Sequence, residues 1–325
     1  MRFFKSLNNK TIFGGIQVYR KNKSLKTGSF YFGIPKWIGS TIRVERPMSF
    51  HNDLALDFEK TVNEITSFIR RVLNEANASG VVIGLSGGVD SSLTAALCVR
   101  ALGAERVLGV LMPTSFTPKE DIKDAYELAE MFKIKTIRVD IDGILESFLK
   151  SAGIPKDDPK MKMPLANLRA RIRMMILYFY ANAYNMLVAG TSDLSELLIG
   201  FFTKYGDGAA DFLPIAHLYK TQVRNLAKYL GIPERIAFKP SSPQLYPGHR
   251  LLDEVPIDYD KLDPVLVGLF KYELPPEEVS RKTGVPLEIV KDIMSRYEKT
   301  MHKRELPPRI THQLSGRINS DKTVR

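Results

Sequence analysis

Cysteine and tryptophan are nearly absent from this chain of 325 residues, which has one of each, and long hydrophobic runs are missing. A single cysteine, Cys98, excludes a disulfide within the chain and fits a reducing setting. Because Cys98 stands in an apolar helix-forming stretch, we expect a packed core thiol rather than a nucleophile. No apolar stretch reaches the roughly 20 residues that a membrane-spanning helix needs. We therefore expect a cytoplasmic protein without a membrane partner.

Net charge is also scarce once the first 47 residues are set aside. Residues 1–47 contain ten Lys or Arg and one acid, so the other 278 residues contribute only +2 of the total charge of +11. Residues 48–325 are therefore nearly neutral and lack the basic surface that nucleic-acid-binding proteins have, so no nucleic-acid partner is expected. The basic segment could be a targeting segment, a nucleic-acid arm or an extension without a folded role. We favour the extension, with Met48 as an alternative start.

The turn after the first expected strand is the most informative part of the sequence. Residues 81–85 predict a buried strand, residues 86–92 (SGGVDSS) a tight turn, and the apolar run up to Leu102 a helix closed by Gly103. This order directs backbone N–H groups and the positive end of a helix dipole at one point, which suits a phosphate or pyrophosphate. Asp90 would repel a phosphate unless a divalent cation lies between them, and Mg²⁺ prefers such oxygens. A plain glycine turn is the alternative, and the flanking serines and Asp90 argue against it.

Two better-known phosphate loops are excluded by the same residues. The segment lacks the Gly-Lys-Ser/Thr ending of a Walker A loop. It also lacks the third spaced glycine of the dinucleotide fingerprint. The loop therefore predicts a phosphate site of another kind.

Strands and helices alternate along the rest of the body, which predicts an α/β protein with a doubly wound, mostly parallel sheet and helices on both faces. Ligands of such sheets lie outside the carboxyl ends of the strands. The last third is expected to be helical. Expected strands are 81–85, 106–112, 136–140 and 186–189, and expected helices are 54–76, 93–102, 120–132, 144–150, 167–184, 195–199, 219–230, 261–270, 276–282 and 287–300, with loops at 151–164, 201–211 and 239–257.

The fourth expected strand ends in the same manner as the first. Thr191 follows the strand and Glu196 lies on the next helical turn, so both would face the site that the loop at 86–92 faces. Asp90 and Glu196 together form a plausible pair of Mg²⁺ ligands. Glu196 is explained equally well as an acid that a helix N-terminus favours.

Three further groups of polar residues are candidates for functional contacts, and the first of them, three arginines, could instead form a solvated, salt-bridged helix end. Arg169, Arg171 and Arg173 are two residues apart on an expected helix, so they point in different directions and should meet different partners. The glycine-rich loop at 203–211 is of a kind that is often functional. The cations at 302–304 follow a helix, and their ordinary role would be to complement its C-terminus.

The loop SGGVDS resembles the pyrophosphate loop of the N-type ATP pyrophosphatases, which include NAD synthetases, GMP synthetase, asparagine synthetase and tRNA-thiolating enzymes. Several longer motifs, in family order, resemble NAD synthetase in particular. The resemblance spans about residues 52–310. It implies one folded NAD synthetase domain at 48–315, preceded by an extension at 1–47 that is disordered or outside this fold, and followed by a tail at 316–325. The motifs are NLRARIRM (167–174), GTSDLSE (190–196), GFFTKYGDGAAD (200–211), LYKTQV (218–223) and HKR (302–304).

The resemblance implies a ligase that makes NAD in two steps, the last of NAD biosynthesis. The nicotinate carboxylate of deamido-NAD attacks the α-phosphate of ATP, which gives an adenylate and pyrophosphate. Ammonia then attacks the acyl carbon, which gives NAD and AMP. Adenylation is needed because a bare carboxylate would have to expel oxide. The site must hold two anions together, so cations and N–H dipoles should dominate it.

The resemblance also implies functional roles for individual residues, according to their positions in these motifs. The resemblance implies Asp90, Lys220 and Thr191 as catalytic residues, Asp90 and Glu196 as Mg²⁺ ligands, and a homodimer with dinucleotide sites at its interface. It further implies two sets of binding residues. ATP would contact Gly84, Leu85, Ser86, Gly87, Gly88, Val89, Asp90, Ser91, Arg173, Tyr178, Thr191, Lys220 and Ser241; deamido-NAD would contact Arg171, Lys204, Asp207, Asp211, His302 and Lys303.

The chain departs from the family pattern at three points. Residues 1–47 are not part of it, and residues 243–250 follow the expected lid segment only loosely. No second domain is present to release ammonia from glutamine, so we expect free ammonia, or ammonia from a separate subunit, as the nitrogen donor. The alternatives are another adenylating member, such as a tRNA thiolase or GMP synthetase type, and a nucleic-acid-binding protein. The nucleic-acid-binding alternative rests on residues 275–300, whose pattern is that of a helix-turn-helix motif.

Overall fold

The computed structural model describes residues 10–13, 16–19, 50, 52–155, 158–242, 244–249, 252 and 254–309. The chain divides into two units, Met1–Met48 and Ser49–Arg325. In the first, β1 (Lys10–Phe13) pairs antiparallel with β2 (Ile16–Tyr19). The rest of the expected extension at 1–47, and residues 310–325 with the expected tail, lie outside the described residues, so the expectations for them stay predictions.

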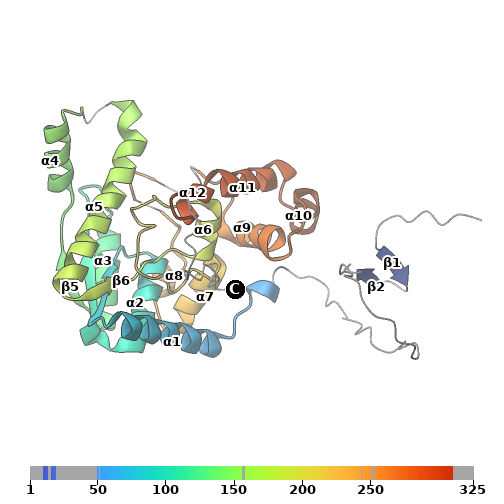
Figure 1. Ribbon diagram of the computed structural model, residues 1–325, viewed down its shortest axis with the longest axis horizontal. Helices are drawn as coiled ribbons and strands as arrows, with labels where there is room; N and C mark the ends of the chain where they lie inside the picture. The colour runs from blue at the N-terminus through green and yellow to red at the C-terminus, as the bar shows by residue number, and fades with distance from the viewer. Residues whose placement is uncertain are drawn as a thin grey trace, which may run out of the picture. The chain divides into compact units, whose positions relative to one another are not determined.

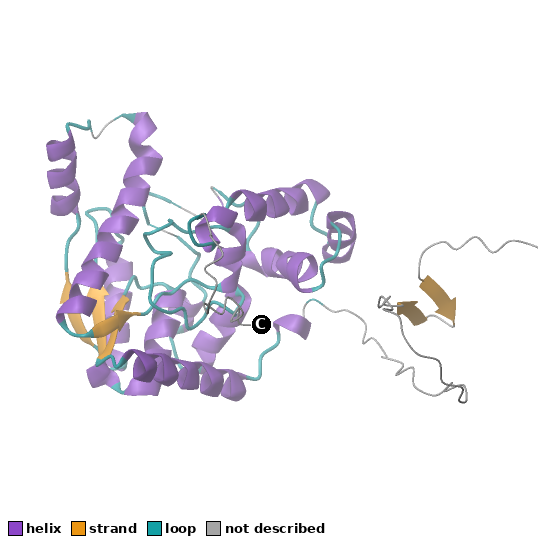
Figure 2. Cartoon of the chain, in the orientation of Figure 1, coloured by secondary structure: helices purple, strands orange, loops and turns teal. Residues whose placement is uncertain are grey.

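The second unit is built on a four-stranded parallel sheet, as the sequence predicted. Its strands are β3 (Gly80–Gly84), β4 (Val107–Leu111), β5 (Lys135–Arg138) and β6 (Met186–Val188), in the order β5-β4-β3-β6. Figure 2 shows these strands side by side with helices around them. The central strands β3 and β4 are rich in Val, Ile and Leu and almost fully buried, as expected for strands covered on both faces.

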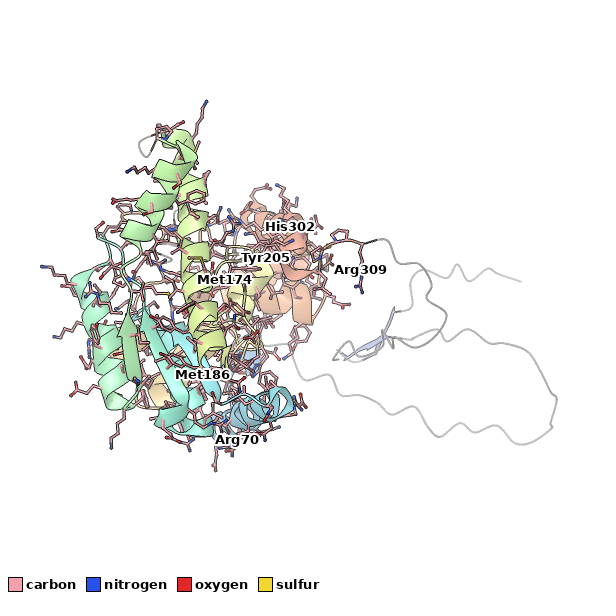
Figure 3. The ribbon with its side chains drawn as sticks, turned by 60° about the vertical axis from the view of Figure 1, so that its left-hand side comes forward. Arg70, Met174, Met186, Tyr205, His302 and Arg309 are labelled. Atoms are coloured by element: carbon pink, nitrogen blue, oxygen red, sulfur yellow. The ribbon has the colours of Figure 1, made fainter. Side chains whose placement is uncertain are left out.

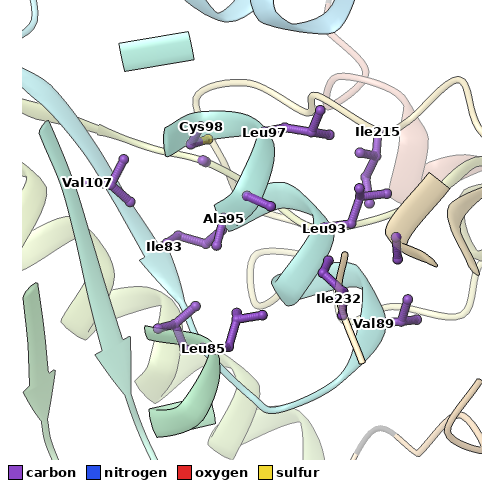
Figure 4. Packing of buried hydrophobic residues seen from close by; sticks show 14 of the residues in the cluster. Ile83, Leu85, Val89, Leu93, Ala95, Leu97, Cys98, Val107, Ile215 and Ile232 are labelled. Atoms are coloured by element: carbon purple, nitrogen blue, oxygen red, sulfur yellow. The ribbon is translucent and has the colours of Figure 1, made fainter. Parts of the chain in front are cut away.

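The two faces of the sheet carry separate hydrophobic clusters because side chains alternate along a strand. Val81 and Ile83 of β3 pack with α1 (Phe58–Ala76), α2 (Val89–Leu102), α3 (Lys119–Met131) and α7 (Lys220–Tyr229). Figure 4 shows part of this cluster, with Ile83 beside Ala95 of α2. Val82 of β3 faces the opposite way and packs with α4 (Asp142–Ala152) and α5 (Lys162–Ala183).

A third hydrophobic cluster joins the C-terminal helices to α6 (Leu194–Ile199). Figure 1 shows α9, α10 and α11 grouped together, in orange to red. The cluster includes Val265 of α9, Val279 of α10 and Ile293 of α11, all fully buried. The elements of this region are α9 (Tyr259–Leu266), a π-helix (Val267–Lys271), α10 (Pro276–Thr283), α11 (Leu287–Lys299) and α12 (Met301–Arg304). The short helix α8 (Glu234–Ala237) packs in the first cluster instead, and 3-10 helices lie at Asn52–Leu54, Ala104–Arg106 and Pro159–Met161.

Most of the predicted helices and strands are present in the structure, and two differ from the prediction in where they begin or end. The loop predicted at 151–164 is wrong at its end, because α5 begins at Lys162. Pro164 lies in the first turn of that helix, where its missing N–H would have no partner anyway. The helix predicted at 261–270 is split, with α9 changing to π-helix at Val267. No helix among the described residues is both long and apolar enough to cross a membrane.

Candidate active site

The turn between β3 and α2 forms the floor of the site. Gly87 has a φ of +77°, a conformation that side chains disfavour. Gly88 is the N-cap of α2 and has no side chain to cover the first amides of the helix. Serine hydroxyls stabilise the turn from within: Ser91 Oγ accepts from the Ser86 amide at 3.3 Å, and Ser92 Oγ donates to the Gly88 carbonyl at 2.7 Å. The resulting helix N-terminus is suited to an anion.

Helix α3 supports the back of this turn. A Cβ atom on Gly87 would lie 2.2 Å from the carbonyl oxygen of Asp121, so only glycine fits there. Lys239 connects the two, because its ammonium lies 3.2 Å from the Gly87 carbonyl, 2.7 Å from Asp121 Oδ1 and 2.5 Å from Asp124 Oδ2. The turn is therefore held between α3 and the segment that follows α8.

A cavity of about 320 Å³ opens above the turn, at the carboxyl ends of the strands. This volume is within the range of small-molecule sites. Most predicted ATP residues line it, together with one predicted dinucleotide residue and the predicted ligand Glu196. The lining includes Gly84, Leu85, Ser86, Gly88, Val89, Asp90, Ser91, Arg173, Thr191, Glu196, Asp207, Lys239 and Ser241.

Beside the cavity, one buried lysine meets three carboxylates. Lys220, the first residue of α7, is 0% exposed, and its Nζ lies 2.7 Å from both carboxylate oxygens of Asp90. The same nitrogen lies 2.8 Å from Glu196 Oε1 and 3.0 Å from Asp193 Oδ2. Asp193 is also 0% exposed, whereas Asp90 and Glu196 are 23% and 18% exposed and line the cavity. The cluster therefore extends from the core to the cavity wall.

The local arrangement of α6 explains why two acids meet there. Asp193 is the N-cap of α6, and its Oδ1 accepts from the Glu196 amide at 2.8 Å. A capping carboxylate stabilises the start of a helix, and it also brings the side chain of the N3 residue to the same end. Asp193 and Glu196 therefore both point toward Lys220.

Burial and charge shift the pKa values in this cluster. Burial raises the pKa of Asp193 to about 7, against the opposing attraction of Lys220. Burial also raises the pKa of Glu196. Burial alone would lower the pKa of Lys220, but the three carboxylates outweigh it and raise that pKa well above its ordinary value. Lys220 is therefore held as an ammonium ion.

The donor set fits a hard divalent cation. Oxygens of Asp90, Asp193 and Glu196 lie within 4.8 Å of one another. Three carboxylates against one ammonium leave a negative formal charge, which a divalent cation would offset. Oδ2 of Asp193, apart from its contact with Lys220, has no hydrogen-bond partner among the described residues. Carboxylate oxygens are the ligands that Mg²⁺ takes together with substrate phosphates.

The three arginines of α5 meet three different partners, which confirms the prediction from their spacing. Arg169 donates to the Leu245 carbonyl at 2.9 Å, Arg171 to the Lys204 carbonyl at 3.2 Å, and Arg173 to the Met112 carbonyl at 3.1 Å. Among the three, Arg173 lies near the phosphate loop and lines the cavity. Burial lowers its pKa to about 10, so the guanidinium stays charged at neutral pH.

The remaining predicted residues lie outside the cavity lining. Lys220 lies behind the wall and Gly87 in the turn, whereas the Tyr178 hydroxyl donates to Asp211 Oδ1 at 3.2 Å. Lys204 donates to the His302 carbonyl at 2.6 Å; Figure 3 labels His302 and Tyr205, the neighbour of Lys204.

Lys303 forms hydrogen bonds with the backbone at the end of α6. Its Nζ donates to the carbonyls of Gly200 and Phe202 at 2.7 and 2.8 Å. These contacts match the ordinary role of a cation at a helix C-terminus, although the helix is α6 and not α11, which precedes Lys303 in the chain. A dinucleotide contact by Lys303 or His302 stays a prediction.

Sequence reasoning missed Asp193 and Lys239 as members of the site. Asp193 stands in the motif 190–196, but as a helix N-cap it had a sufficient local explanation. Lys239 lies in the irregular segment 239–257, where no local pattern indicates a function. Its contacts with Asp121 and Asp124 join residues more than 110 positions apart.

The chain is similar to known proteins over most of its length. The profile of the family described as NAD synthase matches residues 61–307. The NH(3)-dependent NAD(+) synthetase of Hyperthermus butylicus is 50% identical over 256 residues, which cover 78% of this chain and 91% of that protein.

Two solved structures support the same grouping. The NH3-dependent NAD synthetase from Campylobacter jejuni is 33% identical with a TM-score of 0.66, and the match covers 79% of this chain and 100% of that one. The NMN synthetase from Francisella tularensis is 31% identical with a TM-score of 0.69 over the same shares.

Proposed function

The chain belongs to the NAD synthase family, and on that premise we propose that it amidates deamido-NAD with ammonia at the expense of ATP. The products are NAD, AMP and pyrophosphate, and the enzyme is a carbon–nitrogen ligase. One observation carries the proposal: the phosphate loop and the cluster of Asp90, Glu196 and Lys220 converge on one cavity. A loop that binds anions beside clustered carboxylates and a buried ammonium suits phosphoryl chemistry.

The first step is a displacement at the α-phosphate. An oxygen of the nicotinate carboxylate forms a bond to that phosphorus, and the bond to pyrophosphate breaks. The loop at Ser86–Ser91 would hold the β- and γ-phosphates on its amides, which leaves the α-phosphate open to attack. Lys220, an ammonium directly behind the cavity wall and in contact with Asp90, would offset the charge that develops on the phosphates.

A divalent cation completes the charge balance. Asp90 and Glu196, both at the cavity wall, would bind Mg²⁺, and the fully buried Asp193 lies behind them. Mg²⁺ supplies charge neutralisation for the triphosphate. Thr191, at the end of β6, lines the same wall and would donate its hydroxyl to ATP.

In the second step, ammonia forms a bond to the acyl carbon, AMP leaves with the former carboxylate oxygen, and the new amide nitrogen releases one proton to solvent. We propose free ammonia, or ammonia from a separate subunit, as the nitrogen source. A glutaminase nucleophile would need a reactive thiol. Cys98 is 0% exposed and burial raises its pKa to about 12, so its thiolate is not populated at neutral pH.

We further propose that two chains form a homodimer through α5. Its exposed apolar side chains include Met175, 52% exposed, and Phe179, 65% exposed, one turn apart. Exposed large side chains at this spacing form an apolar stripe that a partner would cover. In that dimer Arg171, Lys204, Asp207, Asp211, His302 and Lys303 would serve the deamido-NAD site.

The proposal is tested by incubating the protein with Mg²⁺, ATP, deamido-NAD and an ammonium salt. NAD, AMP and pyrophosphate should appear in equal amounts, and ADP in place of AMP would refute the mechanism. Because one solved relative is named NMN synthetase, a parallel reaction with nicotinic acid mononucleotide measures the preference between the two acids. We expect deamido-NAD to have the higher kcat/KM.

A further inference from the structure

Two buried residues of α9 face the segment that carries Lys220. Tyr259 and Asp263 are four positions apart, so they lie on one face of the helix. Both are 0% exposed. The centroid of the Tyr259 ring lies 5.1 Å from Lys220 Nζ, and Asp263 Oδ2 accepts from the Thr221 amide at 2.8 Å. Helix α9 therefore contacts both the ammonium and the backbone of the lysine segment.

Asp263 fixes the backbone at the start of α7. Its Oδ1 accepts from the Ser195 hydroxyl at 2.6 Å, and Ser195 Oγ in turn accepts from the Lys220 amide at 3.0 Å. The first two amides of α7 are thus satisfied by Ser195 and Asp263, where a helix has no partners of its own. A buried carboxylate is also favoured at that end of the helix dipole. The position of the Lys220 backbone depends on this pair.

Tyr259 acts on the ammonium through its ring. Its hydroxyl is buried and has no hydrogen-bond partner among the described residues, which costs free energy. The ring also lies 5.7 Å from the Arg224 guanidinium. An aromatic face within about 6 Å of a desolvated ammonium attracts it, so the ring has an electrostatic role that the hydroxyl lacks.

We propose that Tyr259 and Asp263 are positioning residues for Lys220. Asp263 fixes the position of the Lys220 backbone. The Tyr259 ring restricts the position of the Lys220 ammonium among its three carboxylate partners. This inference rests on the proposed function, in which the ammonium serves the reacting phosphates. Neither residue lines the cavity, so neither is expected to bind a substrate directly. A role in packing alone would predict equal effects of all well-folded replacements.

The Tyr259→Phe and Tyr259→Leu variants separate the ring from the hydroxyl. Tyr259→Phe keeps the ring and removes an unpaired hydroxyl, so it should keep the wild-type kcat and melt no lower than wild type. Tyr259→Leu should lower kcat about 10- to 100-fold, because small displacements of a catalytic group have effects of this size. KM for ATP and for deamido-NAD should change much less. If Tyr259→Leu does not fold, Tyr259→Met, whose longer and flexible side chain adapts better to the space of the ring, is judged by the same criteria.

The Asp263→Asn variant tests the hydrogen bonds that fix the backbone at the start of α7. Ser195 and Thr221 donate to different oxygens of Asp263, and asparagine has an NH₂ group in place of one of them, so kcat should fall while KM is retained. Asp260→Asn is the matched control, because Asp260 lies on the same helix and is 76% exposed. We expect that control to keep the wild-type kcat.

The possible failures are distinguishable. A wild-type enzyme that makes no NAD from deamido-NAD refutes the proposed function. An active wild type, together with folded leucine, methionine or Asp263→Asn variants whose kcat equals that of Tyr259→Phe, overturns only the positioning roles. A variant that raises KM as much as it lowers kcat also overturns them, because such an effect belongs to substrate binding.

Discussion

Lys220 and Asp90 are 130 residues apart in the chain, yet the lysine Nζ lies 2.7 Å from each carboxylate oxygen of the aspartate. The contact joins the first turn of α7 to the first turn of α2, immediately after the phosphate loop. An ammonium placed there links the loop to the buried acids of α6. Its removal should therefore affect both chemistry and stability.

Lys220→Met should lower kcat by about 100-fold or more, as the loss of a preorganised charge does. It should also destabilise the protein by about 3–5 kcal/mol, because buried carboxylates lose their partner. Chemical unfolding and steady-state kinetics measure the two effects. Because Mg²⁺ can replace the missing charge, it should stabilise this variant more than wild type. Equal stabilisation of the two proteins would contradict the shared site.

Asp193→Asn tests the titration of the buried acids. The pKa of Asp193 is raised from 3.8 to about 7 in the folded protein, so the folded state binds more protons than the unfolded state between these values. The contribution of Asp193 to the free energy of unfolding is therefore fully present below about pH 4 and is lost as the pH rises through about 7. The asparagine keeps an oxygen for the N-cap and does not titrate. Unfolding measured without Mg²⁺ should show a smaller decline with pH for the variant, and parallel curves would refute the assignment.

Gly87→Ala should abolish turnover while the protein still folds. The new Cβ would meet the Asp121 carbonyl at 2.2 Å and would also require a strained backbone, since φ is +77°. Gly153→Ala is the matched control, with a φ of +64° but no atom within 4 Å of the new Cβ. The control should lose about 1 kcal/mol of stability and no activity. ATP binding by calorimetry should be lost only in Gly87→Ala, and full binding there would contradict the role of the turn.

Lys239→Met should raise KM for ATP, because Lys239 holds the Gly87 carbonyl and the acids of α3 together. It also leaves Asp121 and Asp124, both nearly buried, without their ammonium. Lys228→Met, at a lysine that is 58% exposed, is the control and should resemble wild type. An unchanged KM in a folded Lys239→Met variant would show that the loop does not need this support.

Cys98→Ala should leave activity unchanged, because the thiol is fully buried in α2 and its pKa is about 12. Loss of the sulfur should cost about 1 kcal/mol, as small cavities do. Glutamine should not replace ammonium in either protein. Turnover with glutamine that disappears in Cys98→Ala would overturn the inference of ammonia as the donor.

The parts of the site that local patterns encode were predictable from the sequence. The strand, glycine turn and helix around Gly87 follow each other within about 25 residues, and each has its own signal. Thr191 and Glu196 were predictable from the end of β6. The parallel sheet followed from the alternation of elements, although α5 begins earlier than predicted because a proline fits its first turn.

The contacts that complete the site depend on packing between distant segments. Lys220 could be assigned only through resemblance to a family, because nothing in the sequence around it indicates burial beside Asp90. Lys239 reaches α3 across more than 110 residues, and Asp263 reaches Ser195 across 68. Periodicity and spacing describe neighbours in sequence, and these pairs become neighbours only when the separate helices that carry them pack together.

The fate of the carboxylate oxygens of deamido-NAD tests the central claim most directly. We predict that deamido-NAD labelled with ¹⁸O in its nicotinate carboxylate transfers one labelled oxygen to AMP in each turnover, and none to pyrophosphate. Mass spectrometry of the separated products measures both. Label in pyrophosphate, or AMP without label, would contradict attack of the carboxylate on the α-phosphate.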